Sequence, residues 1–274
     1  MTATPLDDTP LDTRLDRAHP GQEPGGLASV SKALMLLESL TAAGDPAGVS
    51  ALARRTGMPK STAFRLLAYL EESGFVERSG KAYQLGRRLF ELGNRVDLCR
   101  PDGLRDIALP HLTDLHTRTG MVVHLGVLDG HDVVYLDKVH GLRTAAVSTT
   151  IGGRVPAACT ALGKAILAFS DPVTVREVVE NGLAPRTRFS VRQPGLMVQQ
   201  LAETRRTALA HDREESQLGI SCVASPVLVD GRAVAAVSAC APTAPVNAEA
   251  HALLVRRTAA EVSRRLHDAG ASAA

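Results

Sequence analysis

The stretch from Val49 to Arg78 reads VSALARRTGMPKSTAFRLLAYLEESGFVER. Its pattern predicts two short helices separated by the break TGMP at 56–59. Gly57 supplies the tight turn, and Pro59 suits the first turn of a helix, where its missing N–H is harmless. We expect Ser50 to cap the first of these helices. In the second helix, apolar side chains recur at helical spacing and predict one buried stripe: Ala63, Leu66, Leu67 and Leu70.

The flanking segments complete a small domain. A helix over 27–40 is predicted upstream, because apolar residues recur every three or four positions and Gly44 and Pro46 follow. The expected buried residues of this helix are Leu27, Val30, Leu34, Leu37 and Leu40. Downstream, FVERSGKAYQL at 75–85 predicts a hairpin around Ser79-Gly80. The order helix, helix, tight turn, helix, hairpin is that of a winged helix-turn-helix.

A winged helix-turn-helix places its last helix in the major groove of double-stranded DNA. We expect the outer face of that helix, the preceding turn and the hairpin tip to contact DNA. The predicted DNA-binding residues are Arg54, Arg55, Lys60, Ser61, Thr62, Arg65, Tyr69, Arg78 and Lys81. For each residue alone, an ordinary solvated face remains the alternative. Aromatic residues make up 3% of the chain and tryptophan is absent, which argues against modes that stack single-stranded bases.

Composition and charge agree with a soluble two-domain chain. The 274 residues are 45% hydrophobic, with no apolar run long enough for a membrane span and no signal sequence, so we expect a cytoplasmic protein. Residues 1–26 carry a net charge of −3 and four prolines and are predicted to be a disordered acidic tail, whereas residues 27–95 carry +4. The four cysteines are far apart and lack zinc spacing, so no metal and no cofactor are expected.

The remaining sequence predicts an α+β domain over 101–268, joined to the first by a linker helix over 86–100 and followed by a short tail, 269–274. A helix is expected up to Thr119, bent near Pro110. Two hairpins are predicted around Asp129-Gly130 and Asp230-Gly231. Helical segments are expected near 160–169, 173–181, 197–210 and 247–267. Hairpins flanked by helices indicate an antiparallel sheet covered by helices.

Several motifs together resemble the IclR family of bacterial transcription regulators. They are SVSKALMLLESL, the opening stretch, YQLGRRLFELG, PHLTDLHTRTGMVVHLGVLDGHDVVYLDKV, VPAACTALGKAILA, HDREESQLGISCVASPV and AAVSACAP. The resemblance covers residues 27 to about 268. It implies a winged helix-turn-helix domain at 27–85, a linker helix and a C-terminal sensor domain similar to GAF-type folds. Family members are typically dimers or dimers of dimers on palindromic operators.

The resemblance also implies where a small-molecule effector binds. The expected effector-binding residues are the N–H groups of Ala161 and Leu162 at a helix N-terminus, with Asp212, Cys222, Ser238 and Cys240. Two departures reduce the polarity of this pocket: Cys240 stands where the family commonly has serine, and Ala158 where many members have histidine. We therefore expect a bulkier effector than the smallest keto acids, with an apolar or aromatic portion.

Two function classes remain open from the sequence. The favoured hypothesis is a ligand-responsive, sequence-specific DNA-binding regulator, preferably a repressor of a catabolic or metabolic operon, with a small organic acid as effector. The alternative is a small-molecule-binding or enzymatic domain whose N-terminal unit serves only assembly. A catalytic Cys222 with His211 and Asp212 is disfavoured, because a small buried cysteine is common, and catalysis would need a base near the thiol. Lys164 is interpreted as a solvated helix lysine, since no phosphate-loop spacing surrounds it.

Overall fold

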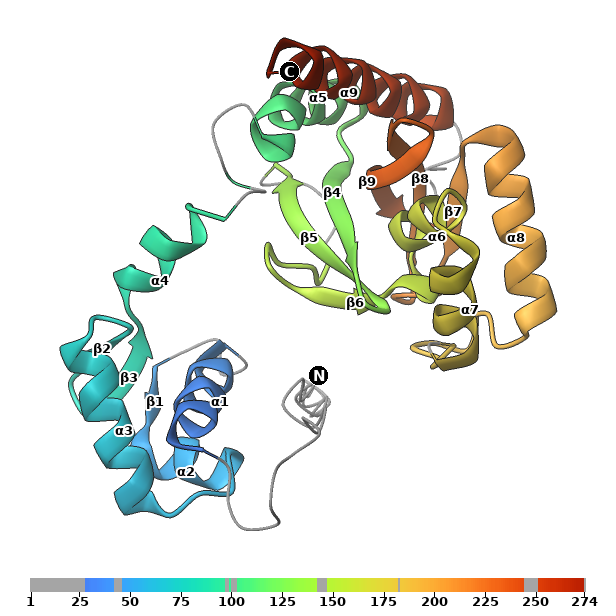
Figure 1. Cartoon of the computed structure of the whole chain (residues 1–274). Coiled ribbons are helices and arrows are strands. Elements are labelled where there is room, and N and C mark those ends of the chain that lie inside the picture. The colour runs from blue at the N-terminus through green and yellow to red at the C-terminus, as the bar shows by residue number, and fades with distance from the viewer. Residues whose placement is uncertain are drawn as a thin grey trace. The chain divides into compact units, whose positions relative to one another are not determined.

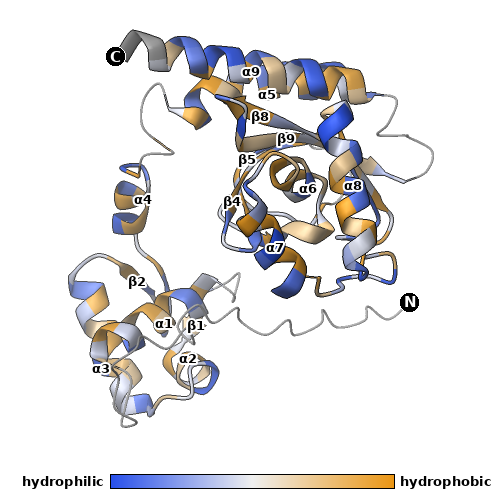
Figure 2. Ribbon diagram, turned by 45° about the vertical axis from the view of Figure 1, so that its right-hand side comes forward, coloured by the Kyte–Doolittle hydropathy of each residue, from blue (hydrophilic) through white to orange (hydrophobic). Residues whose placement is uncertain are grey.

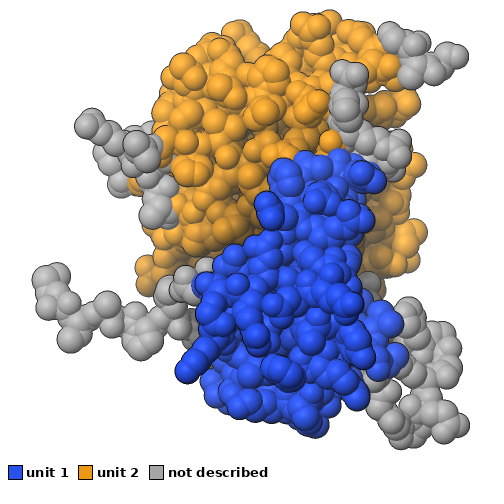
Figure 3. Space-filling model, turned by 90° about the vertical axis from the view of Figure 1, so that its left-hand side faces the viewer, with its two compact units in different colours: residues 1–96 blue, residues 97–274 orange. Residues whose placement is uncertain are grey.

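The computed structural model describes residues 28–41, 46–96, 99, 103–141, 147–181, 183–243 and 251–273. The chain forms two compact units, residues 1–96 and residues 97–274 (Figure 3). This division falls inside the range 86–100 that the sequence predicts as the linker. The acidic tail predicted over 1–26 lies outside the described residues.

The first unit combines helices with a small sheet (Figure 1). Its elements are α1 (Ser29–Thr41), β1 (Ala47–Gly48), α2 (Val49–Arg55), α3 (Lys60–Glu72), β2 (Val76–Ser79), β3 (Ala82–Leu85) and α4 (Arg87–Gly93). The sheet is antiparallel in the order β1-β3-β2. This arrangement is a winged helix-turn-helix, as predicted, although the strand β1 was not expected. The linker helix α4 is shorter than the predicted 86–100.

The helix boundaries around the turn differ slightly from the prediction. Gly48 and not Ser50 is the N-cap of α2, because β1 pairs with β3 and lets the helix begin directly after that strand, at Val49. Pro59 is the N-cap of α3 and does not lie within its first turn. Gly57 has a φ of 66°, a conformation that favours glycine, so the turn assignment is confirmed.

The core of the first unit confirms one predicted stripe and corrects another. In α3, Ala63, Leu66 and Leu67 are buried, as expected from their spacing, and the predicted Leu70 is half-buried against the same core. In α1, the predicted Leu40 is buried and the predicted Leu37 is partly buried against the core. The predicted Val30 is 70% exposed and Leu34 is 46% exposed, whereas Leu36, which was not predicted, is buried. Both sets of α1 side chains have helical spacing, so periodicity alone could not decide which face packs against α3. Leu27, also predicted for this stripe, lies outside the described residues.

The second unit is an antiparallel α+β domain. Its elements are α5 (Leu104–Thr119), β4 (Val122–Asp129), β5 (Asp132–Val139), β6 (Arg154–Pro156), the 3-10 turn η3 (Ala157–Cys159), α6 (Ala161–Leu167), α7 (Pro172–Asn181), α8 (Pro194–Thr207), β7 (Ala210–Arg213), β8 (Ile220–Val229), β9 (Arg232–Pro242) and α9 (Ala252–Ala273). The six strands follow the order β6-β5-β4-β9-β8-β7.

Both predicted hairpins are present, β4–β5 and β8–β9. The short edge strands β6 and β7 were not predicted. Helix α9 continues to Ala273, so the residues predicted as a tail from 269 are helical up to that point.

Helices cover both faces of the large sheet. Helices α5 and α9 pack on one face, where Leu112, Val237 and Val262 belong to one buried cluster. Helix α6 packs on the other face with the buried side chains of Leu162 and Ile166. Figure 2 shows α6 as an apolar helix between the sheet and the more polar helices α7 and α8. The predicted effector-binding residues Ala161 and Leu162 therefore lie where α6 begins against the sheet.

Candidate DNA-binding surface and effector pocket

Helix α3 presents a polar face to solvent. Ser61, Arg65 and Tyr69 are exposed, and Thr62 is half-buried, opposite the stripe that packs in the core. The helix is 13 residues long, and at 1.5 Å per residue it is long enough to cross a major groove. Met58 is buried in the turn and fixes α2 against α3. The structure thus places the predicted reading face on the outside of a rigid helix.

Other predicted DNA-contacting residues lie around this helix. They are exposed, but Arg55 is also hydrogen-bonded within its own unit. Lys60 is exposed at the start of α3, and Arg54 is exposed in the last turn of α2. The guanidinium of Arg55 instead donates to the Ser39 carbonyl at 3.4 Å, across to the end of α1. This contact ties Arg55 to the helix packing of its own domain.

The hairpin between β2 and β3 carries two cations. Ser79 pairs with Ala82, so the turn is Gly80-Lys81, one residue later than predicted. Lys81 is exposed at the tip. Arg78 lies over the Tyr83 ring, 5.3 Å from its centroid, and donates to the Tyr83 hydroxyl at 2.9 Å. The tyrosine therefore holds the Arg78 guanidinium on the wing surface.

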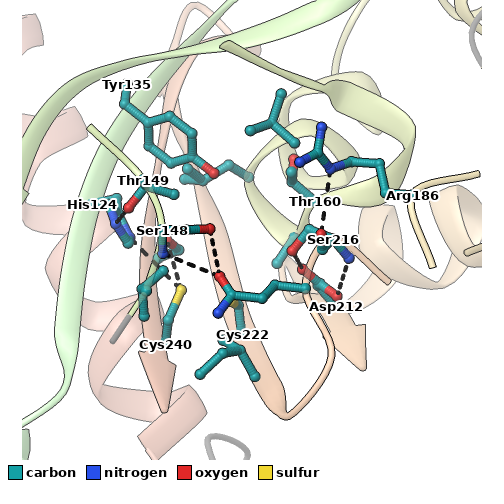
Figure 4. Close-up of a pocket in the computed structure, with 17 residues that line it drawn as sticks. His124, Tyr135, Ser148, Thr149, Thr160, Arg186, Asp212, Ser216, Cys222 and Cys240 are labelled. Carbon is teal, nitrogen blue, oxygen red and sulfur yellow. Dashed lines mark hydrogen bonds between the residues drawn. The ribbon is translucent and has the colours of Figure 1, made fainter. Parts of the chain in front are cut away.

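In the second unit, the sheet register aligns three of the predicted pocket residues. Asp212 on β7 pairs with Cys222 on β8, and Cys222 pairs with Cys240 on β9. Register partners point to the same face, so the three side chains form a row. In the neighbouring row, Ser238 on β9 pairs with His124 on β4. These rows form one wall of a cavity with a free volume of ≈ 50 Å³, drawn in Figure 4.

The N-terminus of α6 forms another wall of this cavity. Thr160 caps the helix, and its hydroxyl accepts from the Gly163 N–H at 2.9 Å. A side chain at Gly163 would lie 2.2 Å from the Ala157 carbonyl oxygen, so the close approach of η3 to α6 requires glycine. The predicted Ala161 and Leu162 both line the cavity. Their N–H groups belong to the first turn, where a helix leaves its donors without intrahelical partners.

Asp212 is held by its own loop. Its Oδ1 accepts from the N–H groups of Glu215 at 2.7 Å and Ser216 at 3.3 Å, and its Oδ2 accepts from the Ser216 hydroxyl. Burial raises the pKa of Asp212 to about 7, although these hydrogen bonds oppose the rise. The side chain is therefore held in place as a part of the pocket wall.

Several polar side chains of the pocket were missed by the sequence reasoning. His124 is buried, and its Nε2 lies 2.7 Å from the Thr149 hydroxyl. Burial raises the pKa of Tyr135, so its hydroxyl stays protonated and can donate. Figure 4 shows Tyr135 and Arg186 on opposite sides of the cavity. The other missed lining residues with polar side chains are Ser148, Thr149, Thr160, Ser216 and Gln217.

More than half of the side chains that line the pocket are therefore polar. Of the missed pocket residues, only His124 could have been found from the sequence, because it is a polar residue inside the apolar strand run MVVHLGV. The distant loop residues gave no comparable signal, since only the fold brings them to the cavity.

Two loops meet at the cavity through one glutamine. The N–H and hydroxyl of Ser148 both donate to Gln217 Oε1, at 3.1 and 2.9 Å. The Lys138 ammonium donates to the carbonyls of Val147 and Thr149, at 2.9 and 2.6 Å, and so holds the segment 147–149 in place. The cavity has room for a few water molecules, so an organic ligand requires these wall segments to move.

The interpretation of Lys164 as a solvated helix lysine is wrong, because its side chain is only 1% exposed. Its ammonium lies 2.5 Å from Glu215 Oε1 and donates to the His211 carbonyl at 3.0 Å. The ion pair thus anchors the turn that carries the donors to Asp212.

Of the two residues considered as partners of a catalytic Cys222, Asp212 lies beside it and His211 does not. His211 and Asp212 are successive residues of β7, so their side chains point to opposite faces of the sheet. His211 lines a different cavity, beside α8. The histidine that approaches the cysteines is His124, whose Nδ1 lies 3.7 Å from Cys240 Sγ.

Two negative findings apply to the described residues only. No helix among them is long and apolar enough to cross a membrane. Within the same residues, no group of three or more His, Cys, Asp or Glu side chains is placed to hold a metal ion.

A winged helix-turn-helix joined to a domain with a small polar pocket defines a DNA-binding regulator that responds to a ligand. The family profile described as "IclR helix-turn-helix domain" matches residues 29–80, and the one described as "Bacterial transcriptional regulator IclR C-terminal" matches residues 100–264. The chain belongs to the IclR family of transcription regulators.

Characterised relatives and solved structures agree with this membership. The Escherichia coli regulator XynR is 32% identical over 81% of this chain and 88% of its own length. The E. coli transcriptional repressor IclR is 29% identical over 81% of this chain and 83% of its own length. The crystal structure of Thermotoga maritima IclR superposes with a TM-score of 0.73 at 34% identity, covering 87% of this chain and 98% of that one.

Proposed function

We propose that this regulator represses a catabolic or metabolic operon and that a small organic acid bound in the pocket of the second unit controls its affinity for DNA. The observation that carries the proposal is the convergence of anion-binding groups at one end of the cavity. Arg186 lies there beside Thr160, where helix α6 begins (Figure 4). A helix N-terminus and a guanidinium both favour a carboxylate.

The opposite end of the cavity suits the rest of such a ligand. Tyr135 offers a hydroxyl donor and a ring face, and His124 and Ser238 lie behind it on the sheet. Cys222 and Cys240 contribute weakly polar thiols to the wall. An acid with a hydroxylated or aromatic body matches this combination. The raised pKa of Asp212 and the three donors on its oxygens weaken the repulsion between this carboxyl group and a bound acid.

DNA recognition follows from the first unit. The exposed Ser61 and Arg65 of α3 would contact base edges and phosphates in the major groove, with Lys60 and Lys81 on the backbone. One winged domain reads only a half-site, so tight binding requires a dimer, or a dimer of dimers, on a palindromic operator. The exposed Phe90 on α4 offers apolar surface for such self-association. The protein would act in the cytoplasm, where its DNA is.

The alternative, an enzymatic domain with an N-terminal unit used for assembly, has less support. No histidine base reaches Cys222 from β7, and the relatives are named as regulators and repressors. We therefore propose no catalytic activity.

The test is a gel-shift titration of the full chain against its own upstream DNA, with and without acids found by a thermal-shift screen. We expect a specific complex that one class of small organic acid changes. The variant Arg186→Gln should lose the response to acid and keep DNA binding. Arg188→Gln is the matched control. Arg188 is two residues after Arg186 in the sequence, but it lies over the Phe189 ring and does not line the cavity. Equal acid responses from the two variants would contradict the assignment.

A further inference from the structure

The pocket wall contains a pair of facing cysteines, and their closeness to each other is not explained by DNA binding or by effector binding. Cys222 on β8 and Cys240 on β9 are direct register partners in an antiparallel pair. Opposed residues in such a pair have Cα atoms about 4.5 to 5.5 Å apart, which lies inside the range of about 4.4 to 6.8 Å found in disulfides. Both thiols are free and buried, and both line the cavity.

The surroundings make the two sulfurs unequal. A hydrogen bond from the Cys222 thiol lowers the pKa of Cys240 despite burial, and the His124 imidazole adds to this effect. The Ser238 hydroxyl lies 3.9 Å from the same sulfur. His124 can act as the donor at Nδ1, 3.7 Å from Cys240 Sγ, when its Nε2 accepts from the Thr149 hydroxyl. The same hydrogen bond raises the pKa of Cys222.

Oxidation of a thiol pair by a peroxide requires this difference between the two cysteines. The thiolate is the reactive form of cysteine, and a neighbouring thiol is needed to trap the first oxidation product as a disulfide. Cys240 has the character of the attacking residue and Cys222 that of the resolving one. Both sulfurs line the cavity, which has room for a molecule of the size of hydrogen peroxide.

We propose that Cys222 and Cys240 form a reversible disulfide when the chain meets a hydroperoxide. The Cys240 thiolate attacks one peroxide oxygen, the O–O bond breaks, and the alkoxide or hydroxide that leaves takes up the proton lost by the thiol. The Cys222 thiol then attacks the sulfenic sulfur and displaces water. Two thiols and one peroxide give one disulfide, one alcohol or water, and one further water. The sulfurs lose two electrons, and the peroxide gains them.

The consequence for regulation rests on the proposed function. A disulfide removes two weak thiol donors and fixes the centre of the pocket wall between Asp212 and Ser238. The effector response would therefore weaken on oxidation, and a thiol reductant would restore it. Disulfides of reducing compartments are generally of this reversible, sensing kind.

The test treats the full-length chain with one equivalent of hydrogen peroxide and maps cysteines by mass spectrometry under non-reducing conditions. We expect a linked pair of peptides that contain Cys222 and Cys240. The variant Cys159→Ser is the matched control, because Cys159 is also buried but its thiol donates to the Ala184 carbonyl, away from the pair. It should form the disulfide like the wild type, whereas Cys240→Ser and Cys222→Ser should not.

The rate of the reaction tests the role of His124. His124→Gln should slow disulfide formation about tenfold or more, because the attacking species is the thiolate. Thermal unfolding of each variant shows whether it is folded. The proposal is overturned if the folded wild type gives no linked peptide, or if oxidised Cys240 accumulates as sulfinic acid while Cys222 stays reduced. Gel shifts on the unoxidised sample test the proposed function separately, since a disulfide can form whether or not the chain binds DNA.

Discussion

Replacing Lys164 by methionine should destabilise the second unit strongly. The side chains of Lys164 and Glu215 are 1% and 7% exposed, and their charged atoms lie 2.5 Å apart. Methionine fills a similar volume but leaves the Glu215 carboxylate buried without its cation. Removing one partner of a buried pair costs about 3–5 kcal/mol. The cost falls at the high end of this range, because Glu215 Oε2 already has no hydrogen-bond partner among the described residues.

Chemical denaturation of the full chain, monitored by a signal that reports unfolding of the second unit, measures this loss of stability. For a unit of this size, about 3–5 kcal/mol corresponds to a lower Tm by roughly 6–20 °C. The surface variant Arg206→Met is the matched control, because Arg206 pairs with Glu203 at 2.6 Å but both side chains are more than half exposed. Such exposed pairs contribute about 0–1 kcal/mol.

A double variant separates the pair from simple packing. Lys164→Met combined with Glu215→Leu removes both charges, and replacing a buried pair with apolar residues is often neutral. The double variant should therefore be more stable than Lys164→Met alone. If the single variant loses less than about 1 kcal/mol, or the double variant is the less stable of the two, the interpretation of a buried, charge-balanced pair is refuted.

Three further predictions concern the reading helix, the α6 turn and the pocket carboxyl. Arg65→Ala should weaken operator binding by about 1–3 kcal/mol, whereas Lys81→Ala should weaken all sequences alike and lower the salt slope by about one, as measured by salt-dependent gel shifts. Gly163→Ala should destabilise the second unit in thermal unfolding, because its Cβ would lie 2.2 Å from the Ala157 carbonyl oxygen. Burial raises the folded-state pKa of Asp212 to about 7, above an unfolded value of about 3.9. Its contribution to stability is thus present below about pH 4 and lost as the pH rises to about 7, and Asp212→Asn should remove this part of the pH dependence of urea unfolding.

Short sequence patterns correctly predicted the features that neighbouring residues determine, namely a helix stripe and the hairpin turns. The stripe in α3 follows from helical spacing, and the hairpin turns at Gly80 and Asp230-Gly231 follow from the few residues that tolerate positive φ. The row of Asp212, Cys222 and Cys240 could be placed from the family resemblance, and the strand register now puts these residues side by side.

Long-range packing decided what the sequence could not show. Lys164 looks like a surface lysine because its partner Glu215 is 51 residues away. His124 becomes a pocket residue only because β4 pairs with β9, which lies more than a hundred residues later. In α1, two apolar faces compete, and contact with the rest of the unit chooses Leu36 over Leu34.

One chain of contacts links the buried ion pair to the ligand site. Lys164 holds Glu215, the Glu215 N–H holds Asp212, and Asp212 stands beside Cys222 on the pocket wall. The same turn leads to Gln217, which accepts both hydrogen bonds from Ser148. We expect a ligand that enters to break or replace the Ser148 contacts, while the ion pair keeps the base of the turn fixed. Because a ligand shifts an equilibrium only by the difference in its affinity for two states, typically 1–3 kcal/mol, the loss of a few hydrogen bonds at this turn is of the right magnitude to set the response.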